Sequence, residues 1–130
     1  MKLLKKVLRY LISSNRWELA HKPLGSSEIF SLLPQDPSYS RADCFLINHQ
    51  GTTFVFFEEF LIEKNRKGYL CVGEIDPQKG ELVNVHKILS KEYHLSYPHV
   101  FQYEDEWYMI PETHSNGSID LYKFDIFPHK

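Results

Sequence analysis

An internal repeat of about 50 residues is the feature of this sequence that most limits its fold. Residues 100–112, VFQYEDEWYMIPE, align with residues 46–58, LINHQGTTFVFFE, at an offset of 54. In both copies two apolar runs flank a polar tip, at 50–51 in the first and at 104–105 in the second. Because a recurring segment forms the same supersecondary unit each time, the repeat predicts two stacked copies of one small sheet.

Each copy consists of short apolar runs separated by turn residues, as strands are. Aromatic residues make up 15% of the chain, and they favour strands. The first copy has a hairpin at 44–60 and further strands at 68–76 and 82–89. The second has a hairpin at 97–112 and a third strand, GSIDLYKFD at 117–125, which aligns with GYLCVGEID of the first copy at an offset of 49.

These strands predict an all-β fold, a partial β-propeller of about two four-stranded antiparallel blades. The middle strands, TFVFF and WYMI, are apolar on both faces, whereas a sheet with one buried face alternates apolar and polar residues. A blade packs between two neighbours, which explains burial on both faces. A β-sandwich and a lone meander are the alternatives. Because propellers have about four to eight blades, we expect a fragment, or a remnant that self-associates through its open blade edges.

The first 15 residues are expected to form a basic amphipathic helix or linker. Their apolar side chains recur at helical spacing over residues 2–13. The first 16 residues carry five basic side chains and no acid, whereas the whole chain has a net charge of −2. The favoured interpretation is a helix that lies on the domain or joins it to a preceding segment. Weak contact of residues 2–13 with an anionic membrane surface is the alternative.

Residues 16–130 are expected to form the incomplete β-propeller domain, with repeat units at about 43–89 and 97–130. Residues 22–40 precede the first unit and hold three prolines and five serines, a composition typical of an irregular connection. The segment RWELA, residues 16–20, is a candidate extra strand.

The net charge and the positions of the cysteines limit the possible binding partners and the cellular compartment. A net charge of −2 with no basic-aromatic stripe predicts no nucleic-acid binding. Cys44 and Cys71 form no CxxC pair and lie in apolar runs, so we expect two buried free thiols. Free thiols are usual in a reducing compartment. No apolar run is long enough to span a bilayer, and the N-terminus lacks a signal-peptide cleavage site, so a cytoplasmic location is predicted.

The second repeat carries the most specific resemblance. The run YHLSYPHVFQYEDEWYMIPET at 93–113, followed by IDLYKF and FP, resembles the N-terminal propeller-like domain of plant glucosamine inositolphosphorylceramide transferases. Bacterial proteins with this module, some attached to formyltransferase-like or glycosyltransferase domains, look similar. The runs FVFFEEF and KGYLCVGEID resemble the preceding blade of that family. The resemblance covers roughly residues 16–128 and implies a propeller linked to glycan or glycolipid assembly.

A more distant resemblance links the chain to five-bladed glycosidase propellers of the arabinanase and levansucrase types. Those enzymes carry an Asp at the start of an innermost strand as base or nucleophile, and a Glu on another blade as acid. Asp43 is expected at such a strand start. The matching position in the second unit is Tyr97, which departs from the acidic pattern.

The strand topology independently places polar residues of both units at one edge of the sheets. The first strand of each unit runs to the tip and the second returns, so the start of one and the end of the other share an edge. The residues expected there are Asp43, Glu58 and Glu59 from the first unit, and His94, Ser96, Tyr97, Glu112 and Thr113 from the second. The acidic tip, residues 104–106, lies at the opposite edge and is expected to be a solvated turn.

Carboxylates beside aromatic rings suit sugars, because acids accept hydrogen bonds from hydroxyl groups and rings stack on apolar sugar faces. Three interpretations of this edge stay open. The acids cap strand ends, or they bind a ligand together with the neighbouring polar residues, or Asp43 and Glu112 act as base and acid. Glycoside hydrolysis requires two carboxylates about 5–9.5 Å apart.

His94 and His99 are five residues apart, and no third or fourth metal ligand stands at a workable spacing. The sequence has no Gly-rich phosphate loop and no nucleophile elbow. We therefore expect neither a metal nor a cofactor.

The function expected from the sequence is a carbohydrate-recognising or accessory propeller module, a fragment of a glycosyltransferase-associated protein of glycan or glycolipid assembly. Its expected partner is a sugar or glycan. A glycoside hydrolase-like propeller with paired carboxylates is one alternative. A non-catalytic interaction scaffold or inactive remnant is the other. Whether the chain catalyses a reaction is left open by the sequence.

Overall fold

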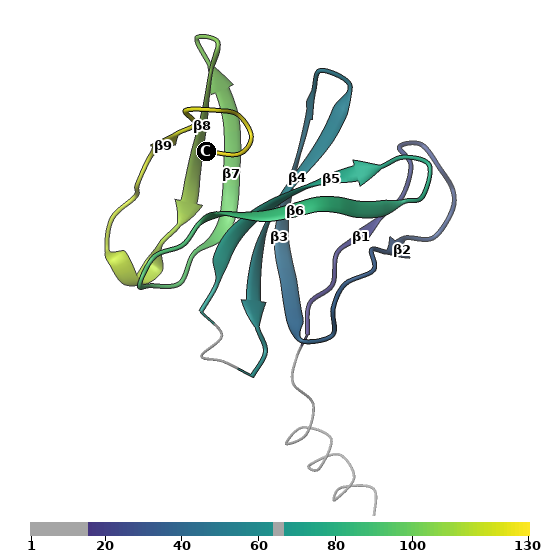
Figure 1. The fold of residues 1–130 in the computed structure, drawn as a ribbon, viewed down its shortest axis with the longest axis horizontal. Coiled ribbons are helices and arrows are strands. Elements are labelled where there is room, and N and C mark those ends of the chain that lie inside the picture. The colour runs from purple at the N-terminus through teal and green to yellow at the C-terminus, as the bar shows by residue number, and fades with distance from the viewer. Residues whose placement is uncertain (1–15, 64–66) are drawn as a thin grey trace, which may run out of the picture.

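The computed structural model describes residues 16–63 and 67–130 as antiparallel strands joined by turns, with one 3₁₀ turn (Figure 1). The helix expected over residues 2–13 lies outside the described residues. In chain order the described elements are β1 (Ala20–His21), β2 (Ser31–Leu32), β3 (Tyr39–His49), β4 (Thr52–Leu61), β5 (Tyr69–Asp76), β6 (Glu81–Leu89), β7 (Ser96–Tyr103), β8 (Glu106–Glu112), the 3₁₀ turn η1 (His114–Asn116) and β9 (Tyr122–Lys123).

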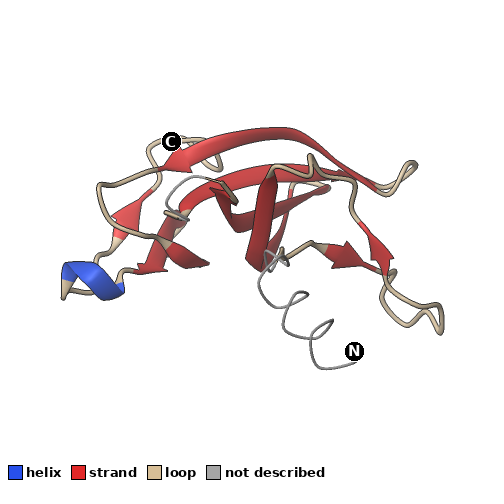
Figure 2. Cartoon of the chain, turned by 90° about the horizontal axis from the view of Figure 1, so that it is seen from below, coloured by secondary structure: helices blue, strands red, loops and turns tan. Residues whose placement is uncertain are grey.

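The strands form three layers. The four-stranded sheet β3-β4-β5-β6 lies in the middle, with the short sheet β1-β2 on one side and the sheet β7-β8-β9 on the other (Figures 1 and 2). Strand β7 contacts β3, β4 and β5 across the layer boundary. The all-β, antiparallel part of the prediction is thus confirmed. None of the described sheets closes on itself, and the second unit has three strands, not four.

The two repeated segments have the same irregularity in their pairing register. In each unit two residues of the first strand oppose one residue of the second, at Asp43-Cys44 and at Tyr97-Pro98. Asp43 and Tyr97, 54 positions apart, both have left-handed backbone, with φ of 51° and 46°. Such an extra residue forms a β-bulge, which redirects the neighbouring side chains. The repeat therefore reproduces an irregularity as well as a strand pattern.

The third strands are also in equivalent register. Val55 pairs with Gly73 in the first unit, and Met109 pairs with Tyr122 in the second. The offsets are 54 for the second strand and 49 for the third, as the sequence alignment predicts. A shorter connection in the second unit accounts for the difference.

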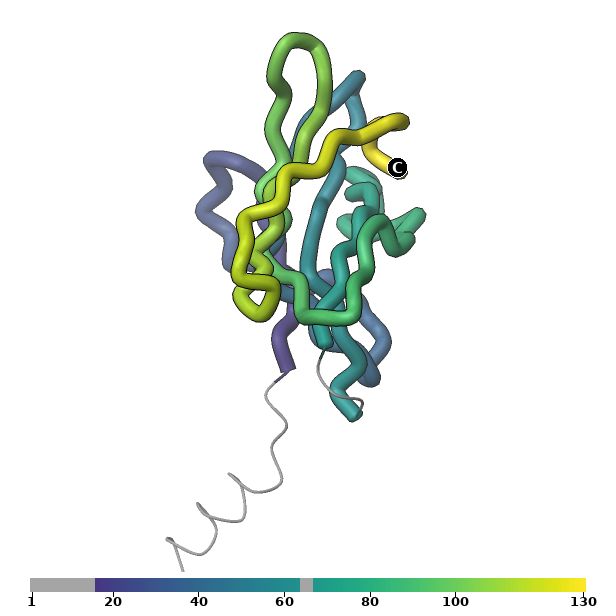
Figure 3. The backbone as a smooth tube through the Cα atoms, turned by 90° about the vertical axis from the view of Figure 1, so that its left-hand side faces the viewer, coloured from purple at the N-terminus to yellow at the C-terminus, as the bar shows by residue number. Residues whose placement is uncertain are grey.

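The two hairpin tips are tight turns that project together from one end of the molecule (Figure 3). Residues Gln50, Gly51, Glu104 and Asp105 all have positive φ, between 47° and 80°. Two consecutive residues of this kind are typical of the hairpin turns that match strand twist. The acidic tip is exposed, as expected, and its last residue, Glu106, forms an ion pair with Lys123 at 3.1 Å.

Strand β4 is buried on both faces, as its sequence predicts. Every residue from 54 to 60 is buried. One face packs against the second unit in a cluster of Phe54, Phe56, Leu70, Val72, Leu95, Val100, Met109 and Phe124. The other face packs under the N-terminal segment in a cluster of Leu19, Leu33, Val55, Phe57 and Cys71. The central sheet is therefore the shared wall of two hydrophobic cores.

The third strand of the second unit is shorter than expected. Instead of a strand over 117–125, only Tyr122–Lys123 pairs with β8. Asn116, Ser118 and Asp120 hydrogen-bond to one another through their side chains. Side chains that bond locally compete with the sheet ladder, so this stretch forms a turn. The candidate strand at 16–20 is also wrong except for its last residue, which begins β1.

Two expectations about β3 are wrong. Asp43 is not at a strand start, because β3 begins at Tyr39 and Asp43 lies in its middle, at the bulge. Cys44 is exposed, whereas Cys71 is the buried thiol that was expected. Cys44 faces a cavity that the N-terminal segment leaves open above the central sheet, which explains its exposure.

The C-terminal tail ties the two units together through Phe127. Its ring stacks on Trp107 at 4.1 Å between centroids, and it meets Phe124 of the same unit edge-on. It also contacts Phe54 and Phe56 of the first unit, at 5.8 and 5.9 Å. Phe127 is therefore a shared core residue although it lies outside every strand.

We expect Phe127→Ala to lower the free energy of unfolding by about 3 kcal/mol, because it removes ring contacts with both units. Ile126→Ala is the matched control, since Ile126 is 62% exposed and should change stability by less than about 0.5 kcal/mol. Urea denaturation of both variants checks this expectation. Equal effects at the two positions would show that the tail does not join the units.

Candidate functional site

The structure brings four of the expected site residues together around the carboxyl group of Glu58. Glu58 is near the end of β4 and only 5% exposed. Asp43, from the bulge of β3, hydrogen-bonds to it, and the charge of Glu112 at the end of β8 acts on it. The fourth residue, His94, approaches from the segment before β7. The shared edge thus contains residues of both units.

The His94 ring joins the two units through a defined pair of hydrogen bonds. Its Nδ1 accepts from the backbone N–H of Gly68 at 2.9 Å. A neutral ring therefore carries its hydrogen on Nε2, which lies 3.2 Å from Oε1 of Glu58. The N–H of Leu95 donates to the carbonyl of Gly68 at 3.1 Å. The first unit thereby orients His94 through the backbone of Gly68 and the carboxyl group of Glu58.

Gly68 is the position on which this packing depends. A Cβ atom there would lie 2.5 Å from the carbonyl oxygen of Leu95, 2.6 Å from Oε1 of Glu58 and 2.9 Å from Cε1 of His94. No side chain fits within those distances without moving backbone atoms. The glycine is therefore required by space, because its own φ lies outside the left-handed region.

Burial raises the pKa of Glu58 from its ordinary value of 4.5 to about 7. The loss of hydration is the largest cause, followed by the charge and hydrogen bond of Asp43 and then by the charge of Glu112. Near neutral pH this carboxyl group is therefore partly protonated. It can donate a hydrogen bond to Asp43 while it accepts one from His94.

An open cavity of about 510 Å³ lies beside these acids. Asp43 and Glu58 form part of its wall. Trp17 and Glu18 from the N-terminal segment also line it, and the Trp17 side chain is 64% exposed. On the second unit, Glu112 lines a separate open cavity of about 380 Å³. The edge therefore offers carboxylates and an accessible indole ring to solvent.

Glu59 lies on the opposite face of β4, away from this group. It accepts hydrogen bonds from Arg41 Nε at 2.7 Å and from the hydroxyl of Tyr69 at 2.8 Å. Burial, reinforced by Glu59, raises the pKa of the nearby Cys71 thiol to about 12 and also raises the pKa of Tyr69. Both carboxylate oxygens of Glu59 thus accept hydrogen bonds from neighbouring side chains, as in a structural residue.

The remaining expected residues divide between the edge and the core. Tyr97 is 51% exposed and meets the ring of Phe45 edge-on at 5.3 Å. Ser96 is buried and opposes Glu112 in the ladder. Thr113 is buried, and its hydroxyl donates to the carbonyl of Ser118 at 2.5 Å. Of these three, Tyr97 has a ring surface available to a ligand.

Sequence reasoning missed Trp17, Glu18 and Gly68. The two residues of the N-terminal segment precede the repeat, so no alignment within the chain could place them at the edge. The exposure of Trp17 became visible only in the structure. Gly68 was noted as a strand start, but its contact with His94 depends on tertiary packing.

In the described part of the chain, no group of three or more His, Cys, Asp or Glu side chains is arranged to hold a metal ion. Within the same residues no helix has the length and apolar character needed to cross a membrane.

Comparison with known proteins identifies the family. Residues 13–130 match the family model described as glucosamine inositolphosphorylceramide transferase 1, N-terminal. The chain belongs to this family. Glucosamine inositolphosphorylceramide transferase 1 of rice, Oryza sativa subspecies indica and japonica, is 36% identical over 92 residues, and that of Arabidopsis thaliana is 32% identical over 99. No solved structure matches the chain.

The match to each relative covers 71% of this chain and 12% of the relative's length. The resemblance inferred from the second repeat is therefore correct at the level of the family. As a member of the glucosamine inositolphosphorylceramide transferase N-terminal family, the chain corresponds to a small part of much longer proteins.

The raised pKa of Glu58 makes folding stability depend on pH. A carboxyl group whose pKa is raised in the folded state contributes its full stabilisation of that state at pH values below its unfolded pKa of 4.5. It loses this contribution as the pH rises through its folded pKa of about 7. We expect the wild type to lose about 3 kcal/mol relative to Glu58→Gln between pH 4.5 and 8. Urea denaturation at a series of pH values measures the difference.

The matched control for this experiment is Glu112→Gln, because Glu112 is the equivalent acid of the second unit and is exposed. In this variant the free energy of unfolding should keep most of its wild-type dependence on pH. Parallel pH profiles for the wild type and Glu58→Gln would contradict a raised pKa at Glu58.

We expect Gly68→Ala to lower the free energy of unfolding by about 1–3 kcal/mol, because the new methyl group overpacks the contact between units. Thermal and urea denaturation measure the loss, with Lys67→Ala at an exposed neighbouring position as control. Stability equal to that of the control would show that His94 and Leu95 are not held against Gly68.

Proposed function

We propose that this chain is a carbohydrate-recognising accessory module, part of a β-propeller in a protein of glycolipid assembly associated with a glycosyltransferase. Membership of the glucosamine inositolphosphorylceramide transferase family supports the link to glycolipid assembly. Two repeat units with matching bulges, packed face to face, support the propeller interpretation.

The observation that carries the sugar-binding proposal is the wall of the 510 Å³ cavity. It places the exposed ring of Trp17 beside the carboxyl groups of Glu18, Asp43 and Glu58. Aromatic rings stack on the apolar faces of sugars, and carboxylates accept hydrogen bonds from hydroxyl groups. Glu58 is fixed by His94 and Asp43 before any ligand arrives. A preorganised acceptor loses little entropy on binding.

The hydroxyl groups of a sugar also need donors, and the site supplies them. Arg41 lines the same cavity, and its guanidinium carries further N–H groups besides the Nε–H that donates to Glu59. A wall that contains both acceptors and donors suits a neutral polyhydroxyl ligand better than a cation or an anion. Tyr97 and Glu112 of the second unit would bind the continuation of a longer glycan.

A glycoside hydrolase-like function is the second candidate, and the perturbed pKa of Glu58 favours it. Paired carboxylates with pKa values moved apart are typical of an acid and its partner base. Asp43 as base with Glu112 as acid is the pairing proposed from the sequence. However, hydrolysis requires both acids to face one substrate, about 5–9.5 Å apart, whereas Asp43 is hydrogen-bonded to Glu58 and Glu112 lines a separate cavity. Recognition is therefore the stronger proposal.

We expect Trp17→Ala to weaken glycan binding by about tenfold, because the loss of a stacking contact costs about 1 kcal/mol or more. A glycan array identifies the ligand, and calorimetry then measures its affinity for the variant. Tyr103→Ala is the matched control, since Tyr103 is a 60% exposed aromatic residue at the remote hairpin tip, and it should bind as the wild type does.

The same ligand separates the two candidate functions. Binding that survives Asp43→Asn and Glu112→Gln, with no sugar released by the wild type, would exclude the hydrolase. Sugar release that both substitutions abolish would establish it. If no glycan on the array binds, or if Trp17→Ala binds as well as Tyr103→Ala, the recognition proposal is wrong.

A further inference from the structure

Two histidines from different units meet at the outer strand of the central sheet. His86 lies in β6, the last strand of the first unit, and His129 lies in the C-terminal tail of the second. Nδ1 of His129 is 3.0 Å from Nε2 of His86, and the ring centroids are 4.8 Å apart. We call these two residues the histidine pair. Because 43 positions separate them in the chain, no local spacing in the sequence predicts the contact.

The carbonyl group of Asn84 determines which ring nitrogen of His86 carries the hydrogen. Nδ1 of His86 is 3.0 Å from this carbonyl oxygen, which can only accept a hydrogen bond. The neutral ring therefore donates from Nδ1 and has its lone pair on Nε2, the atom that faces His129. Metal-binding histidines have the same arrangement, in which one ring nitrogen donates to a backbone carbonyl and the other binds the ion.

The backbone of His129 is fixed by a closed turn. Its N–H donates to the carbonyl of Ile126 at 2.8 Å, and the N–H of Ile126 donates to the carbonyl of Lys130 at 2.8 Å. Phe127, within this turn, stacks on Trp107 of β8. The side chain of His129 is exposed and borders an open cavity of about 190 Å³. The fold therefore positions this residue and leaves space for solvent beside it.

The distance between the two facing ring nitrogens fits a shared metal ion. A bond from a divalent transition metal to an imidazole nitrogen is about 2.0–2.1 Å long. Two nitrogens on one ion are then about 2.9 Å apart at a bond angle of 90°, and about 3.3 Å apart at the tetrahedral angle. The 3.0 Å of the histidine pair lies within this range. An ion can therefore replace the hydrogen between the rings once the ring hydrogen of His129 resides on Nε2.

We propose that the histidine pair binds one divalent transition-metal ion, of the Zn²⁺, Ni²⁺ and Cu²⁺ class that imidazole prefers. The ion joins the edge of the central sheet to the tail of the second unit, and so reinforces the contact that Phe127 makes in the core. Among the residues that the structure describes, no group of three or more His, Cys, Asp or Glu side chains can hold a metal. Water or an exchangeable ligand therefore completes the coordination. This proposal does not depend on sugar binding.

Calorimetric titration with nickel chloride and with zinc chloride tests the proposal. The wild type should bind one ion per chain. His86→Ala and His129→Ala should each weaken binding by about tenfold or more, because the loss of even an indirect partner of a metal costs about that much. Circular dichroism checks that both variants fold, as expected for side chains that are half-buried and exposed, respectively.

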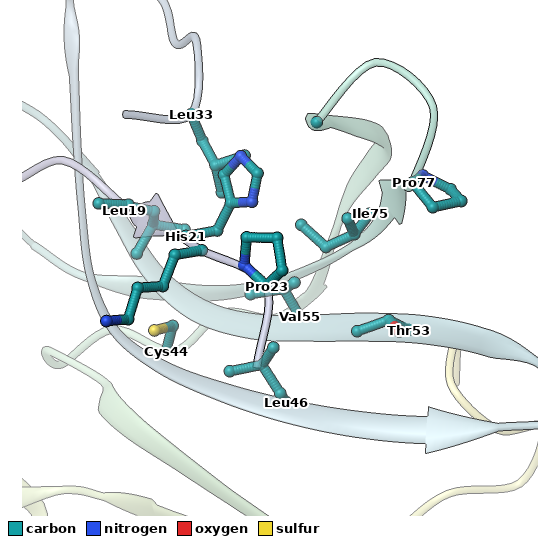
Figure 4. A pocket seen from close by; sticks show the side chains of 13 residues that line it. Leu19, His21, Pro23, Leu33, Cys44, Leu46, Thr53, Val55, Ile75 and Pro77 are labelled. Atoms are coloured by element: carbon teal, nitrogen blue, oxygen red, sulfur yellow. The ribbon is translucent and has the colours of Figure 1, made fainter. Parts of the chain in front are cut away.

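Two control variants separate the histidine pair from other metal-binding side chains. His21→Ala removes another half-buried histidine, which lines a cavity of about 410 Å³ between the central sheet and the N-terminal segment. Figure 4 shows its ring among the apolar side chains of that cavity. Cys44→Ser removes the exposed thiol, an alternative ligand for these ions. Both variants should bind nickel and zinc as the wild type does.

Thermal unfolding shows whether the ion joins the two units. A metal that binds only the folded chain stabilises it more, the further its concentration exceeds Kd. Zinc at about a hundredfold excess over Kd should therefore raise the midpoint of unfolding by about 5 °C or more, and neither variant of the histidine pair should show this rise.

A wild type that binds neither ion would overturn the proposal, as would binding without a rise in the midpoint of unfolding. Wild-type affinity in His86→Ala or in His129→Ala would also overturn it. The same holds for a loss of binding in His21→Ala or Cys44→Ser as large as in the variants of the histidine pair.

Discussion

The need to bury both faces of β4 determines the rest of this structure. Residues 54–60 form an unbroken buried run, and no single neighbouring layer can cover two faces. The chain supplies one cover from its N-terminal segment and the other from a second copy of the same unit. The order of the three layers, the packing of β7 on the central sheet and the position of the candidate site all follow from this requirement.

The site arises where this buried strand carries acids. Glu58 continues the apolar run, and an ionised carboxyl group is costly at such depth unless it has partners. His94, Asp43 and the amide of Gly68 form such a network. His94 of the second unit contacts Glu58 and Gly68 of the first, and Asp43 bonds to Glu58 from the bulge of β3. An aliphatic residue would stabilise the layer boundary more simply. The acid at this position therefore supports the proposed role in binding.

Local pattern and repetition made most of the fold predictable, whereas contacts between layers did not. The strands, the tip turns and the offsets of 54 and 49 could be derived from the sequence, because each depends on residues close in the chain. The exposure of Cys44 and the shortness of β9 depend on an open cavity and on side-chain bonds in a turn. Trp17 and Gly68 reach the site through tertiary packing, which no periodicity encodes.

Divergence between the two units explains why the site is one-sided. The bulge position holds Asp43 in the first unit and Tyr97 in the second, although both have the same backbone conformation. The following strand ends in a buried Glu58 in one unit and an exposed Glu112 in the other. The same geometry thus presents acids from one unit and an aromatic ring from its neighbour. Acids beside an aromatic ring suit the binding of a sugar, whereas hydrolysis would require two separated carboxylates facing one bond.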